Sequence, residues 1–366
     1  MLAGIRVVDL SRLLPGPFCT QILVDLGAEV IKVEDPNGGD YLRHMPPQLD
    51  DGTCVLFHAL NRGKKSVCLD LKDARDNARF RALVKTADVV VESFRPGVLE
   101  KLGLAPAALL AQNPRVIVCS ISGYGQQGAY RLKAGHDVDY LARAGVLGMM
   151  HDPTLLPVQV ADMAGGAQPA ALQILAALVG RASTGQGALI DVSMTHQAFG
   201  LLTSSYARAS AGEGPLGGGR DVLVGRVPCY GVYPAQDGHI AVGALEPKFW
   251  QGLCAALEMP ELRDRGMDDG AAGDEARALL AGRLRTKTRA EWTAFFAPHD
   301  VCVEAVRTPE EALADRAFAG VDVEVAGKRV RLPVPACGIA GVTPSSVRAP
   351  ALGEHTDAVL GALPPG

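Results

Sequence analysis

The stretch that decides the fold is Gly4–Glu34, which reads GIRVVDLSRLLPGPFCTQILVDLGAEVIKVE. Its first part, Gly4–Ser11, is rich in β-branched residues and predicts a strand, whereas Gly16–Ala28 has the length and composition of a helix. A second strand is expected at Glu29–Glu34. A strand, a helix and a strand in this order form a βαβ unit, whose two strands run parallel.

The same alternation continues along the first 125 residues, and a further strand follows near the middle of the chain. Further strands are predicted at Ser66–Leu71, Ala87–Phe94, Val116–Ser122 and Gly185–Met194, and a helix at Lys72–Thr86. These elements predict an α/β fold with a Rossmann-like parallel sheet. Ligands of such sheets bind at the carboxyl ends of the strands, so we expect the site there.

The second half of the chain indicates a smaller domain inserted into the first. A glycine-rich stretch, Ala211–Asp221, is the best linker candidate, and the β-like and helical pieces after it predict an α+β domain. We therefore expect a large domain at 1–210, completed by 330–366, and a small domain at 211–329.

Composition excludes several classes of function. The net charge of −4 over 366 residues gives no basic surface for nucleic acid or an anionic membrane. The longest apolar run, Ala170–Gly180, is too short to cross a bilayer, and no signal peptide is visible. The eight cysteines are scattered without metal-ligand spacing, which favours reduced thiols in a cytoplasmic protein and predicts no metal site.

A glycine motif follows the strand that ends at Ser122. Gly123, Gly125 and Gly128 match the dinucleotide fingerprint G-x-G-x-x-G. That fingerprint requires a helix opening at the third glycine, and the residues after Gly128 show no helical period. The motif therefore indicates a turn rather than a nicotinamide or flavin site.

Two residues after this loop are candidates for chemistry. His136 stands between Gly135 and Asp137, although a lone histidine is more often an ordinary polar group. Asp162 precedes small residues and lies near the expected start of a helix, unless Pro169 marks that start. Backbone N–H groups at such a helix start favour an anion.

Several blocks in order resemble the family III CoA-transferases, and within them the α-methylacyl-CoA racemases. They are Gly4–Glu34, NRGKKSVCLDLK (Asn61–Lys72), ADVVVESFRPGVLEKLGL (Ala87–Leu104), GYGQQG, GHDVDYLARAGVL (Gly135–Leu147) and the tail LGEHTDAVL (Leu352–Leu360). The resemblance covers essentially the whole chain. It implies that the glycine loop belongs to a CoA site and that the chain forms an interlocked homodimer.

The resemblance also implies the reaction. Racemases of this group use a histidine and an aspartate, which match His136 and Asp162, to invert the α-carbon of a 2-methylacyl-CoA through an enolate in lipid metabolism. Asp137 and Glu246, the latter from the small domain of the partner subunit, are expected to tune His136. The alternative is a CoA-transferase, in which Asp162 attacks the thioester and forms an acyl anhydride.

For the CoA moiety, the only cofactor-like group expected, the resemblance points to residues near the ends of the early strands. They are Leu13, Leu69, Lys72, Ser93, Phe94, Arg95, Lys101 and Gly125. The chain departs from the family pattern at Asp35, where a basic residue is usual, and Arg12, Arg43 or Lys72 could compensate. Further departures are Gln159 and Met163. The aromatic content of 5% argues against an aromatic-lined pocket.

Overall fold

The computed structural model describes residues 1–49, 52, 54–334 and 338–364. Cys337, one of the eight cysteines, lies outside the described residues. The described chain forms two compact units. The first comprises Met1–Ala144, Leu156–Leu201 and Arg316–Gly366, and the second comprises Gly145–Leu155 and Leu202–Asp315.

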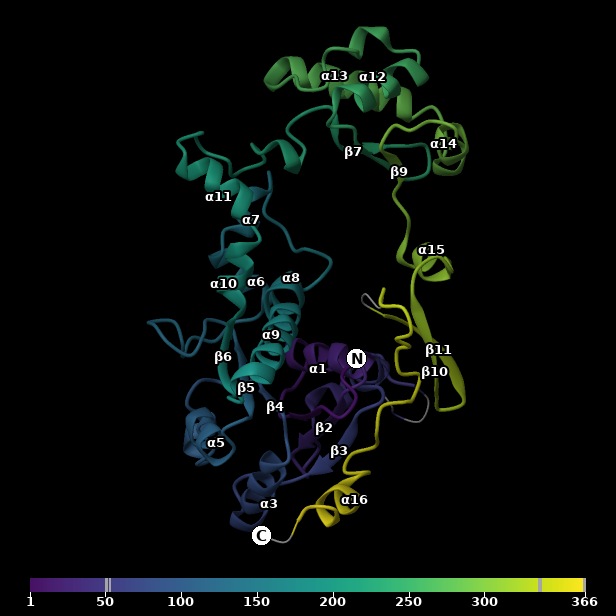
Figure 1. Ribbon diagram of the computed structural model, residues 1–366. Helices are drawn as coiled ribbons and strands as arrows, with labels where there is room; N and C mark the ends of the chain where they lie inside the picture. The colour runs from purple at the N-terminus through teal and green to yellow at the C-terminus, as the bar shows by residue number, and fades with distance from the viewer. Residues whose placement is uncertain (50–51, 53, 335–337, 365–366) are drawn as a thin grey trace. The chain divides into compact units, whose positions relative to one another are not determined.

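The first unit is built on a six-stranded parallel sheet in the order β3-β2-β1-β4-β5-β6 (Figure 1). The strands are β1 (Arg6–Asp9), β2 (Glu29–Glu34), β3 (Lys65–Cys68), β4 (Val89–Glu92), β5 (Ile117–Ser122) and β6 (Ala188–Ser193). This is the strand order of a doubly wound nucleotide-binding fold, so the predicted α/β class with a Rossmann-like sheet is confirmed.

Helices cover both faces of this sheet. On one face α1 (Pro15–Asp25) packs against α9 (Gln168–Thr184), and on the other α3 (Ala74–Lys85), α5 (Pro106–Gln112) and α16 (Thr356–Gly361) contribute to a shared core. Helices on both sides explain why the strands read as continuous apolar runs. The remaining helices of this unit are η1 (Tyr41–His44), α2 (Val55–Asn61), α4 (Val98–Lys101), α6 (Asp137–Arg143), α8 (Val160–Asp162), η2 (Met163–Ala167) and α10 (Met194–Gly200).

The helical run Val160–Thr184 is longer than the apolar segment seen in the sequence. Within the described part of the chain it is the one helix long and apolar enough to cross a membrane, with a mean hydropathy of 1.3. Its α9 portion packs one side against α1, β5 and β6, and a third of the apolar window is buried.

The C-terminal part returns to the first unit. A hairpin of β10 (Gly320–Val325) and β11 (Lys328–Pro333) turns at Ala326 and Gly327, which both have positive φ, as a two-residue hairpin requires. The sequence reading did not predict this hairpin. The tail then bonds to the β3 edge, where the N–H of His355 donates to the carbonyl of Ser66 at 2.9 Å.

The second unit pairs a three-stranded antiparallel sheet with helices. Its strands are β7 (Tyr230–Pro234), β8 (His239–Gly243) and β9 (Val303–Ala305). Its helices are α7 (Val146–Met149), α11 (Thr203–Ser210), η3 (Val222–Val224), α12 (Pro247–Ala256), η4 (Pro260–Leu262), α13 (Gly270–Leu284), α14 (Arg289–Phe296) and α15 (Pro309–Ala314). Contacts place the unit boundaries near 145, 155, 201 and 315, whereas the sequence analysis set them at 210 and 329.

Candidate active site

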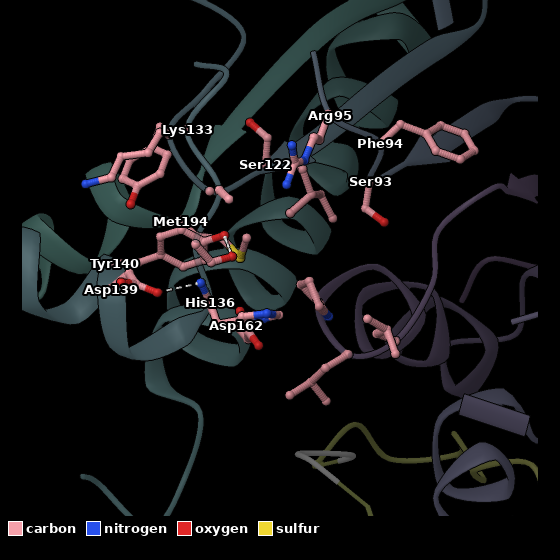
Figure 2. A pocket seen from close by; sticks show the side chains of 18 of the residues that line it. Ser93, Phe94, Arg95, Ser122, Lys133, His136, Asp139, Tyr140, Asp162 and Met194 are labelled. Carbon is pink, nitrogen blue, oxygen red and sulfur yellow. Dashed lines mark hydrogen bonds between the residues drawn. The ribbon is translucent and has the colours of Figure 1, made fainter. Parts of the chain in front are cut away.

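A cavity of about 790 Å³ lies within the first unit, at the carboxyl ends of β1, β4 and β5 (Figure 2). This is the edge at which an open parallel sheet binds its ligands. Its wall comes from the loop after β1, the loop after β4, the segment from β5 to α6, and Asp162. His136 and Asp162, the two residues singled out for chemistry, both line it.

His136 is the N-cap residue of α6 and has an extended backbone. It ends the long segment that leaves β5, in which Gly125 and Gly128 take positive φ values that glycine tolerates best. No helix opens at Gly128, since α6 begins at Asp137, which agrees with the reading of the glycine motif as a turn. The His136 side chain is exposed to the cavity.

Asp162 sits at the end of the short helix α8, and its environment favours the protonated form. Burial, and secondly the negative charge of Asp137, raise the pKa of Asp162 from 3.8 to about 6, while His136 acts in the opposite direction. Loss of hydration and a neighbouring like charge both disfavour a carboxylate. A carboxyl whose pKa lies near 6 is suited to act as a general acid or base close to neutral pH.

The carboxylate of Asp137 joins the two candidate residues through the backbone. Its Oδ1 atom accepts hydrogen bonds from the N–H groups of Ala161 at 2.7 Å and Asp162 at 3.0 Å. The N–H of Met163 donates to the carbonyl of Gln159 at 3.0 Å. The N–H groups of Ala161, Asp162 and Met163 are thus all engaged within the protein.

A π-helical turn, Met163–Ala167, connects α8 to α9, and such turns are often found at functional sites. The helical run begins at Val160, so Asp162 lies in its first turn, and Pro169 lies in the first turn of α9 after the π-helical turn. A Cβ added at Gly165 would lie 2.9 Å from the carbonyl oxygen of Met194, so the absence of a side chain allows this close approach.

The residues expected to bind CoA divide into two groups. Leu13, Ser93, Phe94 and Arg95 line the cavity, whereas Leu69, Lys72, Lys101 and Gly125 are not part of its wall. Leu69 is buried in the sheet core, and Lys72 and Lys101 are exposed on the surface. Gly125 is buried in the loop after β5.

Leu13 has a φ of 62°, which is strained for a branched side chain, and a buried network holds it there. Its N–H donates to Asp40 Oδ1 at 3.1 Å, and Asp40 pairs with Lys32 at 2.9 Å, both side chains being fully buried. Lys32 also donates to the carbonyl of Ser11 at 2.8 Å. The network therefore fixes the loop that carries Arg12 and Leu13.

Of the three cations considered in place of a basic residue at position 35, Arg12 alone lines the cavity. Its guanidinium lies 5.3 Å from the ring centroid of Tyr41 and 5.8 Å from that of Phe94. The guanidinium of Arg43 is instead paired with Glu34 through two hydrogen bonds of 2.9 and 2.7 Å. Arg43 is thus occupied inside the fold.

The sequence reading missed part of the wall. Tyr41, Tyr124 and Tyr140 line the cavity in addition to the predicted Phe94, so the inference from a low aromatic content is wrong for this pocket. Arg131, Lys133, Asp139 and Met194 also line it. Tyr140 was detectable, since it follows His136 by one helical turn.

Glu246, the remaining predicted residue, belongs to the second unit, where it is the exposed N-cap residue of α12. It begins that helix ahead of Pro247, which lies in its first turn. The cysteines among the described residues form no disulfide, and Cys302 is exposed.

Comparison with known proteins gives a consistent set of relatives. The family model of CoA-transferase family III matches residues 2–356. The chain is 37% identical to α-methylacyl-CoA racemase of Homo sapiens, over 98% of this chain and 92% of that protein. It is 35% identical to succinyl-CoA:mesaconate CoA-transferase of Haloarcula hispanica, over 80% of this chain and 75% of that one. A CaiB/BaiF family protein from Brucella suis superposes with a TM-score of 0.84 at 30% identity, covering 99% of both chains.

Proposed function

This chain belongs to CoA-transferase family III, and on that premise we propose that it inverts the α-carbon of 2-methylacyl-CoA thioesters. The observation that carries the proposal is that His136 and Asp162 line one cavity while the pKa of Asp162 is raised to about 6. The similarity to α-methylacyl-CoA racemase supports the same activity.

The reaction needs a base on one face of the α-carbon and an acid on the other. One residue takes the α-proton, the electron pair of the C–H bond moves into the thioester to form an enolate, and the other residue returns a proton to the opposite face. Neutral His136 would act on one epimer and ionised Asp162 on the other. Each turnover exchanges their protonation states, and the reverse reaction or exchange with water restores them.

The other parts of the proposal concern binding and assembly. Arg12 and Arg95 would meet the CoA phosphates, since guanidinium groups bind phosphate in a bidentate manner. Asp137 would hold the backbone of Asp162 and raise its pKa. Glu246, contributed by the second unit of the partner subunit, would tune His136.

A homodimer is part of the proposal. Large apolar side chains are exposed on the first unit, among them Leu172 and Val179 of α9 and Leu189 of the edge strand β6. Large exposed apolar patches mark interaction sites, and we expect these side chains to lie at the interface between two copies of the chain. We expect light scattering to give twice the chain mass of 38.3 kDa.

A CoA-transferase is the second candidate. Its support is the similarity to succinyl-CoA:mesaconate CoA-transferase and the cationic wall of the cavity, where Arg95, Arg131 and Lys133 could hold an acceptor carboxylate. The Asp162 carboxylate would then attack the thioester carbon and release CoA thiolate, leaving an acyl anhydride.

Incubation of the protein with one epimer of a 2-methylacyl-CoA in D₂O distinguishes the two. Deuterium uptake at the α-position with loss of stereochemical purity supports the isomerase. His136→Ala should lower its rate by about 10² to 10⁴, the usual contribution of a general acid or base. His151→Ala, at a highly exposed histidine of the second unit, is the matched control. Absence of exchange, with CoA passing to added succinate, would favour the transferase.

A further inference from the structure

The peptide unit that joins Gly135 to His136 is bonded at both ends by the first turn of α6. The carbonyl of Gly135 accepts a hydrogen bond from Tyr140 Oη at 2.5 Å, and the N–H of His136 donates to Asp139 Oδ2 at 2.9 Å (Figure 2). A peptide unit is planar, so holding its oxygen and its nitrogen fixes the orientation of the whole plane.

The Tyr140 ring is held in place by close packing. It is 7% exposed and meets the Tyr124 ring edge-on at a centroid distance of 5.2 Å. A Cβ added at Gly123 would lie 2.4 Å from the ring, and one added at Gly135 would lie 2.8 Å from it. The ring therefore occupies the space between the end of β5 and the residue before His136, and only glycine leaves that space open on both sides.

The hydroxyl of Tyr140 remains a donor at working pH. Burial, and secondly the charge of Asp162, raise the pKa of Tyr140 to about 12. The Tyr140 hydroxyl therefore keeps its proton, and its hydrogen bond to Gly135, at neutral pH.

We propose that Tyr140, together with Asp139, is a positioning residue that fixes the backbone of His136 and so sets the reach of its imidazole into the cavity. This inference rests on the proposed function for its catalytic consequence. Tyr140 itself exchanges no proton with substrate in this scheme. Its hydrogen bond is made to the main-chain carbonyl of the residue before His136, so it acts on the backbone from which the exposed imidazole extends.

Tyr140→Phe tests the inference because it removes the hydroxyl and keeps the ring. A displacement of about 1 Å in a reacting group costs about a hundredfold in rate, so we expect kcat to fall about ten- to a hundredfold with KM changed less than about threefold. In D₂O, exchange of the epimer served by His136 should slow more than exchange of the epimer served by Asp162. A general loosening of the fold would slow both equally.

Tyr233→Phe is the matched control. Tyr233 is also buried, and its hydroxyl donates to the carbonyl of Pro228 at 2.5 Å, again five residues earlier in the chain. It belongs to the second unit and is not one of the residues that line the cavity. Both variants should lose similar stability in urea unfolding, but Tyr233→Phe should retain the wild-type kcat.

An NMR measurement keeps the inference testable without turnover. In protein labelled with ¹⁵N-histidine, the His136 imidazole signal, identified by its loss in His136→Ala, should shift or broaden in Tyr140→Phe and remain unchanged in Tyr233→Phe. An unchanged His136 signal in Tyr140→Phe would overturn the inference. So would wild-type kcat in that variant. Wild-type protein without α-proton exchange would instead overturn the proposed function, and the NMR result would still decide the positioning role.

Discussion

The raised pKa of Asp162 makes a prediction about stability that does not depend on any substrate. Folding changes the proton affinity of this carboxyl by about two powers of ten, because its pKa rises from 3.8 to about 6. At about 1.4 kcal/mol for each power of ten, this corresponds to a free-energy difference of about 2 to 3 kcal/mol. The lower value applies because water in the cavity screens the partly exposed carboxyl.

The sign follows from linkage. Between pH 4 and pH 6 the folded protein keeps a proton on Asp162 that the unfolded chain has lost, so the contribution of this group to stability falls as pH rises and is lowest above pH 6. Asp162→Asn carries no charge at any of these pH values. We therefore expect the free energy of unfolding of the variant, minus that of the wild type, to increase by about 2 to 3 kcal/mol between pH 4 and pH 8.

Urea unfolding of both proteins at several pH values between 4 and 8 measures this difference. Subtracting the two curves removes the contribution of every other titrating group that the substitution leaves unchanged. A difference that is constant with pH would refute the reasoning, and a wild type that gains stability over the variant as pH rises would reverse it.

Other substitutions test separate parts of the site. Asp137→Asn keeps an oxygen that can accept hydrogen bonds from the backbone but removes the negative charge near Asp162. The acid limb of the pH–rate profile, which we expect Asp162 to set near pH 6, should move down by about one pH unit or less, because burial is the larger cause of the raised pKa. An unmoved or raised limb would contradict this. Gly165→Ala places a methyl group against the backbone carbonyl of Met194 and should lower both stability and kcat. Gly180→Ala has open space at its Cβ and should stabilise the protein by about 0.5 to 1 kcal/mol without loss of activity. If the two variants behave equally in unfolding and turnover assays, close packing at Gly165 is excluded as the reason for its glycine. Arg12→Gln should weaken CoA binding about tenfold in calorimetry through loss of one charged phosphate contact, and unchanged affinity would remove Arg12 from the CoA site.

Much of the first unit followed from local patterns. The alternation of β-branched runs with helix-length segments was sufficient to predict a parallel sheet and a site at the carboxyl ends of its strands, where the cavity lies. In the second unit the helix Gly270–Leu284 was missed, because its two internal glycines and scattered charges obscure the helical spacing of Ala276, Leu280 and Leu284, which are buried. Local propensity is weak where tertiary packing decides the outcome.

The sequence by itself determined the order of elements, the family resemblance and the two residues most suited to proton transfer. Only the tertiary structure decided how they are held: that Asp137 bonds to the backbone of Asp162, that Tyr140 bonds to the residue before His136, and that Arg43 is occupied by Glu34. The physical reason is that hydrogen bonds and desolvation depend on distances of a few ångströms. Such distances between segments far apart in the chain are set when the sheet closes and its loops pack together, and a local pattern of residues does not contain them.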